Sequence, residues 1–315
     1  MIKKNISIVI PCYNEEKNLH LLTQKLFQET TKLKNYNFNF LFVDDGSSDN
    51  TFEVIENLSK TDKMIKGIKL SRNFGSHIAI SAGIENVENS DSVIVISADL
   101  QEPPEIIKKL LIKWNEGFDV VWSLRNKRSQ SLISKFFSFL FYKLFVNFSD
   151  LKNYPKKGPS SFFLLDKKVF KNWKRFKESN RMVLGMVSWM GFNQTSINYD
   201  QNTRYSGKSS FNFFKLLKLA IDSFIAYSFA PIRLISLLGI IISSISFFYA
   251  IYLIIENLIY KTNITGWTSL MVIVLFLGGV QLITLGIIGE YVWRGVDESR
   301  NRPLYLISKK INFKE

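Results

Sequence analysis

Short apolar runs alternate with longer amphipathic stretches along the first 125 residues of the chain. Runs rich in Val, Ile or Phe predict strands, and apolar residues at helical spacing predict helices. We expect strands at residues 6–10, 38–43, 65–70, 93–96 and 120–124, and helices at residues 15–33, 50–59, 76–85 and 104–115. This alternation favours an α/β fold with a mostly parallel sheet and helices on both faces.

Two uncharged runs follow in the last third of the chain, at residues 234–255 and 264–289. The first would span roughly 33 Å as a helix, against a hydrocarbon core of about 30 Å. We therefore predict two C-terminal transmembrane helices. Basic residues flank the pair, with Arg233 before it and Arg294, Arg300, Arg302, Lys309 and Lys310 after it. The positive-inside rule then places the N-terminal domain and both termini in the cytoplasm.

Two further segments, residues 132–148 and 211–227, combine phenylalanines with lysines at helical spacing. Such helices suit a membrane interface, where apolar side chains enter the acyl boundary and lysines meet lipid phosphate. The alternative is a pair of ordinary core-facing helices. We favour the interfacial interpretation because membrane spans follow. The predicted domains are a cytoplasmic domain at residues 1–230, a membrane region at 231–290 and a basic cytoplasmic tail at 291–315.

Charge and cysteine content narrow the possible partners and the compartment. The chain has 41 Lys and Arg against 27 Asp and Glu, a formal net charge of +14. Such an excess favours anionic partners, namely nucleic acid, anionic lipid or phosphorylated substrates. Cys12 is the only cysteine, so no intrachain disulfide forms, which fits a reducing compartment.

Polar residues follow three of the predicted strands, in the segments PCYNEEKNL (11–19), VDDGSSDNT (43–51) and SADLQEPPE (97–105). The carboxyl ends of parallel strands meet at one edge of an open sheet, where such folds bind ligands. Asp99 and Gln101 offer hard oxygen ligands there. The alternative is a helix start at Pro103 without any chemistry. The first loop contains no glycine, which argues against a dinucleotide-binding motif, and the chain has no P-loop.

The segments PCYNEEKNL, VDDGSSDNT, SRNFGSHIAISAGI and ADLQEPPE, in this order, resemble the catalytic domain of glycosyltransferase family 2. Residues 204–212, 229–233 and 287–305 resemble its polyprenyl-phosphate glycosyltransferase branch. The resemblance implies a GT-A-like fold and an enzyme that transfers a hexose, with inversion, from a nucleotide sugar such as a UDP sugar. The acceptor would be a polyprenyl phosphate such as undecaprenyl phosphate at the cytoplasmic membrane face. It also implies a homo-oligomer, and we expect no nucleic-acid partner.

The resemblance also implies roles for individual residues. The residues that it implies for nucleotide binding are Pro11, Tyr13, Glu15, Asp44 and Asp45. Asp99 and Gln101 match metal-binding positions, where Mg²⁺ or Mn²⁺ bridges the donor diphosphate and acts as a Lewis acid. The catalytic set is Asp99, Arg125 and Arg204, and the acceptor-phosphate set is Arg125, Arg128, Arg204, Ser206 and Lys208. For Arg125 and Arg128, a solvated basic surface is the competing interpretation.

Physical chemistry supports this substrate class. A lipid phosphate has a second pKa of about 6, so its oxygen is largely ionised and needs little help from a general base. The difficulty is the approach of two anions, which cationic side chains and a metal would stabilise.

The chain also departs from the family pattern. Ser97 stands where the family commonly has Asp, and Ser161 and Phe163 stand where related enzymes often have an acidic and a basic residue. These changes are compatible with weaker metal binding, another donor or loss of activity. One alternative is therefore a catalytically silent, nucleotide-binding membrane scaffold. The other is a processive polysaccharide synthase, although the Q-x-x-R-W motif of such enzymes is absent.

Overall fold

The computed structural model describes residues 3–126, 151, 154–155, 159–179, 181–203, 230–260 and 266–313. The predicted interfacial helices at 132–148 and 211–227 lie outside these residues, as do Arg128, Arg204, Ser206 and Lys208. The chain forms two compact units. The first comprises Met1–Leu217 and Arg302–Glu315, and the second comprises Lys218–Asn301.

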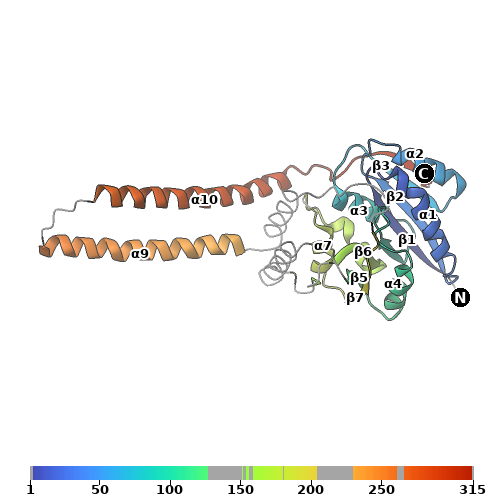
Figure 1. The fold of residues 1–315 in the computed structure, drawn as a ribbon, viewed down its shortest axis with the longest axis horizontal. Helices are drawn as coiled ribbons and strands as arrows, with labels where there is room; N and C mark the ends of the chain where they lie inside the picture. The colour runs from blue at the N-terminus through green and yellow to red at the C-terminus, as the bar shows by residue number, and fades with distance from the viewer. Residues whose placement is uncertain are drawn as a thin grey trace. The chain divides into compact units, whose positions relative to one another are not determined.

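A mixed sheet forms the centre of the first unit (Figure 1). Within the described residues it has eight strands in the order β7-β5-β6-β4-β1-β2-β3-β8. The strands are β1 (Lys4–Cys12), β2 (Tyr36–Asp44), β3 (Ile65–Leu70), β4 (Ser92–Val95), β5 (Val120–Arg125), β6 (Pro159–Asp166), β7 (Gln194–Tyr199) and β8 (Ile307–Ile311). The pairs β4–β1, β1–β2, β2–β3 and β5–β7 are parallel, whereas β6 and β8 run antiparallel to their neighbours.

Helices cover both faces of the sheet, so two apolar cores form. The main helices are α1 (Glu16–Thr30), α2 (Thr51–Thr61), α3 (Ser76–Glu85) and α4 (Ile106–Asn115). The short ones are α6 (Lys167–Phe170), the 3₁₀ turn η1 (Trp173–Arg175) and α7 (Val183–Trp189). One core packs α1, α2 and α4 against strand residues such as Ile8, and the other packs α3, η1 and α7 against residues such as Val9. Successive residues of β1 therefore pack into opposite cores.

The predicted α/β class and the five predicted strands and four predicted helices of the first 125 residues are confirmed. Strand β6 was not predicted, although Phe162 and Leu164 enter one core while Phe163 and Leu165 enter the other. The sequence of a strand buried on both faces is a continuous apolar run. It lacks the alternation of apolar and polar residues by which a half-buried strand is predicted.

Strand β8 also differs from expectation, because residues 291–315 were interpreted as a basic tail. Instead, Ile307–Ile311 pairs antiparallel with β3 at the edge of the sheet. Ile307 and Ile311 pack against the cores while Lys309 and Lys310 are exposed. Because two lysines lie between Ile307 and Ile311, the sequence pattern of this segment does not predict a buried strand. The two isoleucines nevertheless attach the strand to the sheet.

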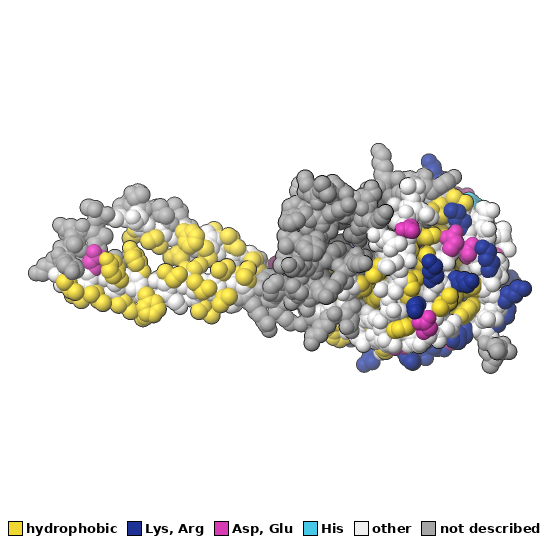
Figure 2. Space-filling view, turned by 60° about the horizontal axis from the view of Figure 1, so that its bottom comes forward, with side chains coloured by type: hydrophobic (Ala, Val, Ile, Leu, Met, Phe, Trp, Pro, Cys, Tyr) yellow, Lys and Arg dark blue, Asp and Glu magenta, His cyan; other side chains and the backbone are white. Residues whose placement is uncertain are grey.

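The second unit contains two long helices, α9 (Ala230–Tyr260) and α10 (Trp267–Ser299). Apolar side chains cover the surface of both helices (Figure 2), and Ile240 and Phe276 are more than 60% exposed. Within the described residues, one segment, Phe276–Ser299, is long and apolar enough to cross a membrane, and Leu234–Tyr249 is a shorter apolar segment. The prediction of two spans is thus supported by length and composition for one of them.

Candidate active site

The predicted site residues that the structure describes lie at or just after the strand ends along one edge of the sheet, where the parallel strands end. Cys12 at the end of β1 is in register with Asp44 at the end of β2. Arg125 at the end of β5 is in register with Tyr199 at the end of β7. The loop after β4, which carries Asp99, leaves the sheet in the same direction because β4 is parallel to β1.

The loops after β1 and β2 are joined by hydrogen bonds. The Asn14 amide donates to Ser47 Oγ at 2.9 Å, and the Ser48 amide donates to Asn14 Oδ1 at 2.9 Å. The Glu15 amide donates to Thr51 Oγ1 at 2.8 Å, which ties the start of α1 to the start of α2. The loop leaves the Tyr13 side chain 43% exposed. An aromatic face is therefore presented at the strand edge.

Asp44 is fully buried between these loops. Its Oδ1 accepts a hydrogen bond from the Ser47 amide at 3.0 Å, while burial raises the pKa of the carboxyl above its usual value. Its Oδ2 accepts no hydrogen bond from the described residues. A buried acceptor without a partner is costly, on the order of 1–3 kcal/mol. Among the described residues, Asp44 therefore keeps one unused acceptor at the end of β2.

Asp45, next in the chain, supports the loop after β3. Its two carboxylate oxygens accept hydrogen bonds from the amides of Phe74 and Gly75 at 2.8 and 2.9 Å. Burial raises its pKa to about 6. The loop lies so close that a Cβ on Gly46, whose φ is +66°, would be 2.3 Å from the carbonyl carbon of Arg72. In the structure, Asp45 therefore stabilises the loop after β3. Its predicted contact with a nucleotide stays a prediction.

Asp99 and Gln101 flank a tight turn after β4. The Gln101 amide donates to Asp99 Oδ1 at 3.2 Å, and the intervening Leu100 has a φ of +60°. A left-handed Leu is strained and persists only where its surroundings determine the backbone. Here the Leu100 side chain is buried in the core, and the Gln101 carbonyl accepts from the Asn202 amide at 3.0 Å. The turn brings the two predicted metal ligands together at the surface of the edge.

Two residues that the sequence analysis did not select complete this part of the site. Glu102 is 1% exposed; its Oε2 accepts from the Ser97 amide at 2.8 Å and its Oε1 lies 3.8 Å from Arg125 Nη2. Arg125 Nε donates to the Tyr199 hydroxyl at 3.2 Å. Burial raises the pKa of Glu102 to about 7. The position of Glu102, directly after Gln101, was an available signal, whereas Tyr199 ends a strand that was not predicted.

The donor set fits a hard divalent cation. The Asp99 carboxylate and the Gln101 side-chain amide both provide oxygen and lie on one partly exposed turn. No group of three or more His, Cys, Asp or Glu side chains arranged to hold a metal occurs in the part of the chain that the structure describes. Asp99 and Gln101 are thus the two predicted cation ligands that the described residues place on this turn.

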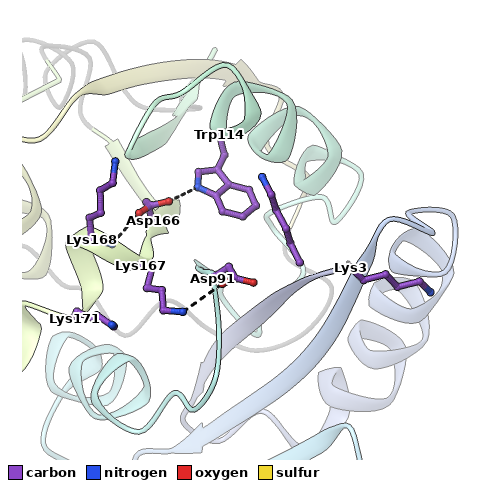
Figure 3. A pocket seen from close by; sticks show the side chains of 8 residues that line it. Lys3, Asp91, Trp114, Asp166, Lys167, Lys168 and Lys171 are labelled. Carbon is purple, nitrogen blue, oxygen red and sulfur yellow. Dashed lines mark hydrogen bonds and ion pairs between the residues drawn. The ribbon is translucent and has the colours of Figure 1, made fainter. Parts of the chain in front are cut away.

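A hollow of about 590 Å³ lies at the opposite end of the strands from the candidate site, near the amino ends of β1 and β4 (Figure 3). Five lysines contribute to its lining, but nearby groups occupy several of them. Lys4 Nζ lies 4.4 Å from the centroid of the Trp114 ring, and Lys167 pairs with Asp91 at 3.4 Å. Trp114 Nε1 donates to Asp166 at 2.7 Å. None of the predicted site residues that the structure describes lines this hollow, which has the character of a solvated basic surface.

Sequence comparisons match the chain to a known family and to curated relatives. The sequence model of the family described as glycosyl transferase family 2 matches residues 7–173. An uncharacterized glycosyltransferase of Synechocystis is 41% identical over 304 residues, which cover 96% of this chain and 94% of that protein. The SfII prophage-derived bactoprenol glucosyl transferase of Shigella flexneri is 37% identical over 305 residues, covering 96% of this chain and 97% of the relative.

Solved structures resemble the chain more distantly. Mannosyl-3-phosphoglycerate synthase from Rubrobacter xylanophilus aligns with a TM-score of 0.49 and 14% identity, covering 70% of this chain and 71% of that protein.

Proposed function

The chain belongs to glycosyltransferase family 2, and we propose that it transfers glucose or another hexose, with inversion, from a nucleotide sugar such as a UDP sugar to a polyprenyl phosphate. The observation that carries this proposal is the 37% identity, over nearly the whole of both chains, to a relative named bactoprenol glucosyl transferase. The geometry of the strand edge supports it, because the site offers groups for a base, a diphosphate and an incoming anion.

The nucleotide would bind across the ends of β1 and β2. The exposed ring of Tyr13 suits stacking on a base. The unused Oδ2 of Asp44 suits an N–H or hydroxyl donor of the base or ribose. Because Asp44 is fully buried, groups around it would have to move for a ligand to reach that oxygen. Pro11 and Glu15 border the same loop pair.

The diphosphate would lie over the Asp99–Gln101 turn. These two residues would hold Mg²⁺ or Mn²⁺, and such a cation, when bound, offsets the negative charge of the leaving nucleoside diphosphate. Arg125, at the end of β5, is one-quarter exposed, and its positive charge would face the same diphosphate. Its guanidinium is oriented by Tyr199, so it is ready to contact a phosphate oxygen.

In the transfer step, an oxygen of the lipid phosphate forms a bond to the anomeric carbon of the sugar. The bond from that carbon to the diphosphate oxygen breaks, and its electron pair leaves with the nucleoside diphosphate. Attack from the opposite face inverts the anomeric centre. No strong base is required, because a phosphate monoester with a second pKa of about 6 is already ionised. Arg204, Ser206, Lys208 and Arg128 are proposed for the acceptor phosphate on the family resemblance alone.

We place the reaction at a membrane. The apolar side chains exposed along α9 and α10 require an apolar surrounding, and we propose that both helices span the bilayer with the catalytic unit in the cytoplasm. A homo-oligomer packed through membrane-proximal segments is part of the same proposal.

The test is a donor screen. Membranes containing the protein are incubated with undecaprenyl phosphate and UDP-glucose, UDP-N-acetylglucosamine or GDP-mannose, and the lipid product is identified by mass spectrometry. We expect a glycolipid from at least one donor. If nucleotide binds but no donor yields product under varied Mg²⁺ and Mn²⁺, the silent-scaffold alternative is correct.

Asp99→Asn tests the site itself. Loss of the carboxylate charge should lower kcat on the order of 100-fold to 1,000-fold, the scale typical for removing one electrostatic contact to the reacting charge. Glu116→Gln, an exposed carboxylate at the end of α4, serves as the matched control and should retain full activity. A wild-type rate in Asp99→Asn would remove Asp99 from the mechanism.

A further inference from the structure

Glu102 is a buried carboxylate at the centre of the candidate site with no role assigned so far. It is 1% exposed, although acidic residues are seldom buried to this degree unless they are paired. Among the described residues, one of its oxygens accepts a hydrogen bond, from the Ser97 amide at 2.8 Å. The other, Oε1, accepts no hydrogen bond from the described residues. A buried, half-satisfied carboxylate is costly, so its position requires a specific explanation.

The unsatisfied oxygen is directed at one cation. Glu102 Oε1 lies 3.8 Å from Arg125 Nη2, within ion-pair range but beyond hydrogen-bond length. The Nε of the same guanidinium is held by the Tyr199 hydroxyl at 3.2 Å. Arg125 is therefore held at two points, by Tyr199 through a direct hydrogen bond and by Glu102 through charge. At one-quarter exposed, its guanidinium remains accessible to a ligand.

Glu102 also anchors the turn that carries the predicted metal ligands. Its contact with the Ser97 amide spans the loop from just before Asp99 to just after Gln101. The Gln101 carbonyl is fixed in turn by the Asn202 amide. One side chain thus connects the strand-end arginine with the turn beside it.

We propose that Glu102 is a positioning residue of the diphosphate site, which holds Arg125 and the Asp99–Gln101 turn in the arrangement that receives a nucleoside diphosphate. The inference rests on the proposed function and extends it to a residue that acts through Arg125 rather than on the substrate. Replacement of a buried ion pair by apolar groups is often neutral or stabilising. A purely structural need would therefore not favour a carboxylate here.

The experiment is a double-mutant cycle on binding of UDP in the presence of Mn²⁺, measured by calorimetry on the full chain in detergent. The variants are Glu102→Gln, Arg125→Gln and the two together. Glu102→Gln preserves shape but places an amide beside the guanidinium, so Arg125 should move away. We expect each single change to weaken UDP binding on the order of 10-fold to 100-fold, the scale observed for residues that orient a ligating group. The double variant should bind within about twofold of Arg125→Gln alone.

Two additional variants separate positioning from a general effect on folding. Glu102→Asp keeps the charge and should bind UDP more tightly than Glu102→Gln, whereas Glu116→Gln should bind like the wild type. The positioning role would be overturned if the loss of UDP affinity in the double variant equalled the product of the losses in Glu102→Gln and Arg125→Gln. Binding of UDP with full affinity by Glu102→Gln would also overturn it.

The cycle distinguishes this inference from the proposed function. If the wild-type protein binds UDP and the cycle shows coupling, yet no donor yields a glycolipid, the positioning role of Glu102 stands and the transfer proposal fails. If the wild-type protein binds neither UDP nor GDP, both proposals fail. If glycolipid forms but the two changes are independent, only the role of Glu102 is overturned.

Discussion

Asp44 and Asp45 are adjacent carboxylates at the end of β2, and they make different contacts. Asp44 Oδ2 accepts no hydrogen bond from the described residues, whereas both oxygens of Asp45 accept backbone amides of the loop after β3. An unused acceptor suits ligand recognition, and a saturated carboxylate suits loop construction. The Asp-Asp sequence alone does not distinguish them, because the loop that saturates Asp45 comes 29 and 30 residues later.

Asp45 should make stability depend on pH. Burial raises its pKa from 3.8 to about 6, so the folded state holds a proton that the unfolded chain has released. The stabilisation is fully present below about pH 4 and is lost as the pH rises through 6. The difference corresponds to about 3 kcal/mol. We expect Asp45→Asn to flatten the fall in melting temperature between pH 4 and pH 7, measured on the full chain in detergent.

Glu116→Gln is the control for this measurement, because its carboxylate is exposed and should leave the wild-type pH profile unchanged. Parallel melting curves for the wild type and Asp45→Asn over the whole range would contradict the prediction.

At the scale of elements, residues 302–313, which we call the C-terminal strap, complete the edge of the sheet. β8 pairs with β3, and the Ser71 amide donates to the Leu306 carbonyl at 2.9 Å. The Tyr305 hydroxyl donates to Glu85 Oε2 at 2.8 Å, and Glu85 also binds the buried Arg181. The strap thus fixes the C-terminal end of α3 and the start of the loop that wraps Asp45. An edge strand that would otherwise be open is covered.

Tyr305→Phe should destabilise the catalytic unit. The change leaves Glu85 Oε2 without its hydroxyl donor and removes an acceptor from Asn86, whose side-chain amide lies 3.1 Å from the Tyr305 hydroxyl. An unsatisfied, partly buried carboxylate costs about 1–3 kcal/mol. We expect a lower melting temperature. Tyr36→Phe, which removes an exposed hydroxyl bonded to Asn115, should leave it nearly unchanged. Equal effects of the two substitutions would rule out a specific role for the strap contact.

At the scale of the whole molecule, chain order places the two long helices between two parts of one catalytic unit. The unit is formed by Met1–Leu217 together with Arg302–Glu315, and α9 and α10 come between them in the sequence. If both helices cross a bilayer, the chain returns to the side from which it left. The incorporation of β8 into the sheet requires an even number of crossings, which agrees with the proposal of two spans.

Cysteine labelling tests this topology. In a Cys12→Ser background, which removes the only native thiol, single cysteines are placed as Asn257→Cys between the predicted spans and as Ser308→Cys on β8. A membrane-impermeant maleimide should label Asn257→Cys in intact cells and Ser308→Cys only after lysis. Glu116→Cys in the catalytic unit should behave like Ser308→Cys. Labelling of Ser308→Cys in intact cells would contradict a cytoplasmic catalytic unit.

The sequence by itself determined the alternation of strands and helices through Arg125 and the convergence of three polar strand-end loops. These features depend on local periodicity and on the shared direction of parallel strands, both of which short segments encode. The same reasoning selected Asp99 and Gln101, which the structure places on one turn. Both are visible in the sequence because they directly follow an apolar strand.

Only the tertiary structure decided which groups meet across the sheet. Strand β6 enters between β4 and β5, and β8 joins β3 from the far end of the chain; pairing over such separations leaves no local signal. Glu102 becomes a buried partner of Arg125, 23 residues later, because β5 lies near the loop after β4. Burial and charge pairing depend on neighbours brought from elsewhere in the chain, so the chemical state of a carboxylate is decided by packing rather than by the motif that contains it.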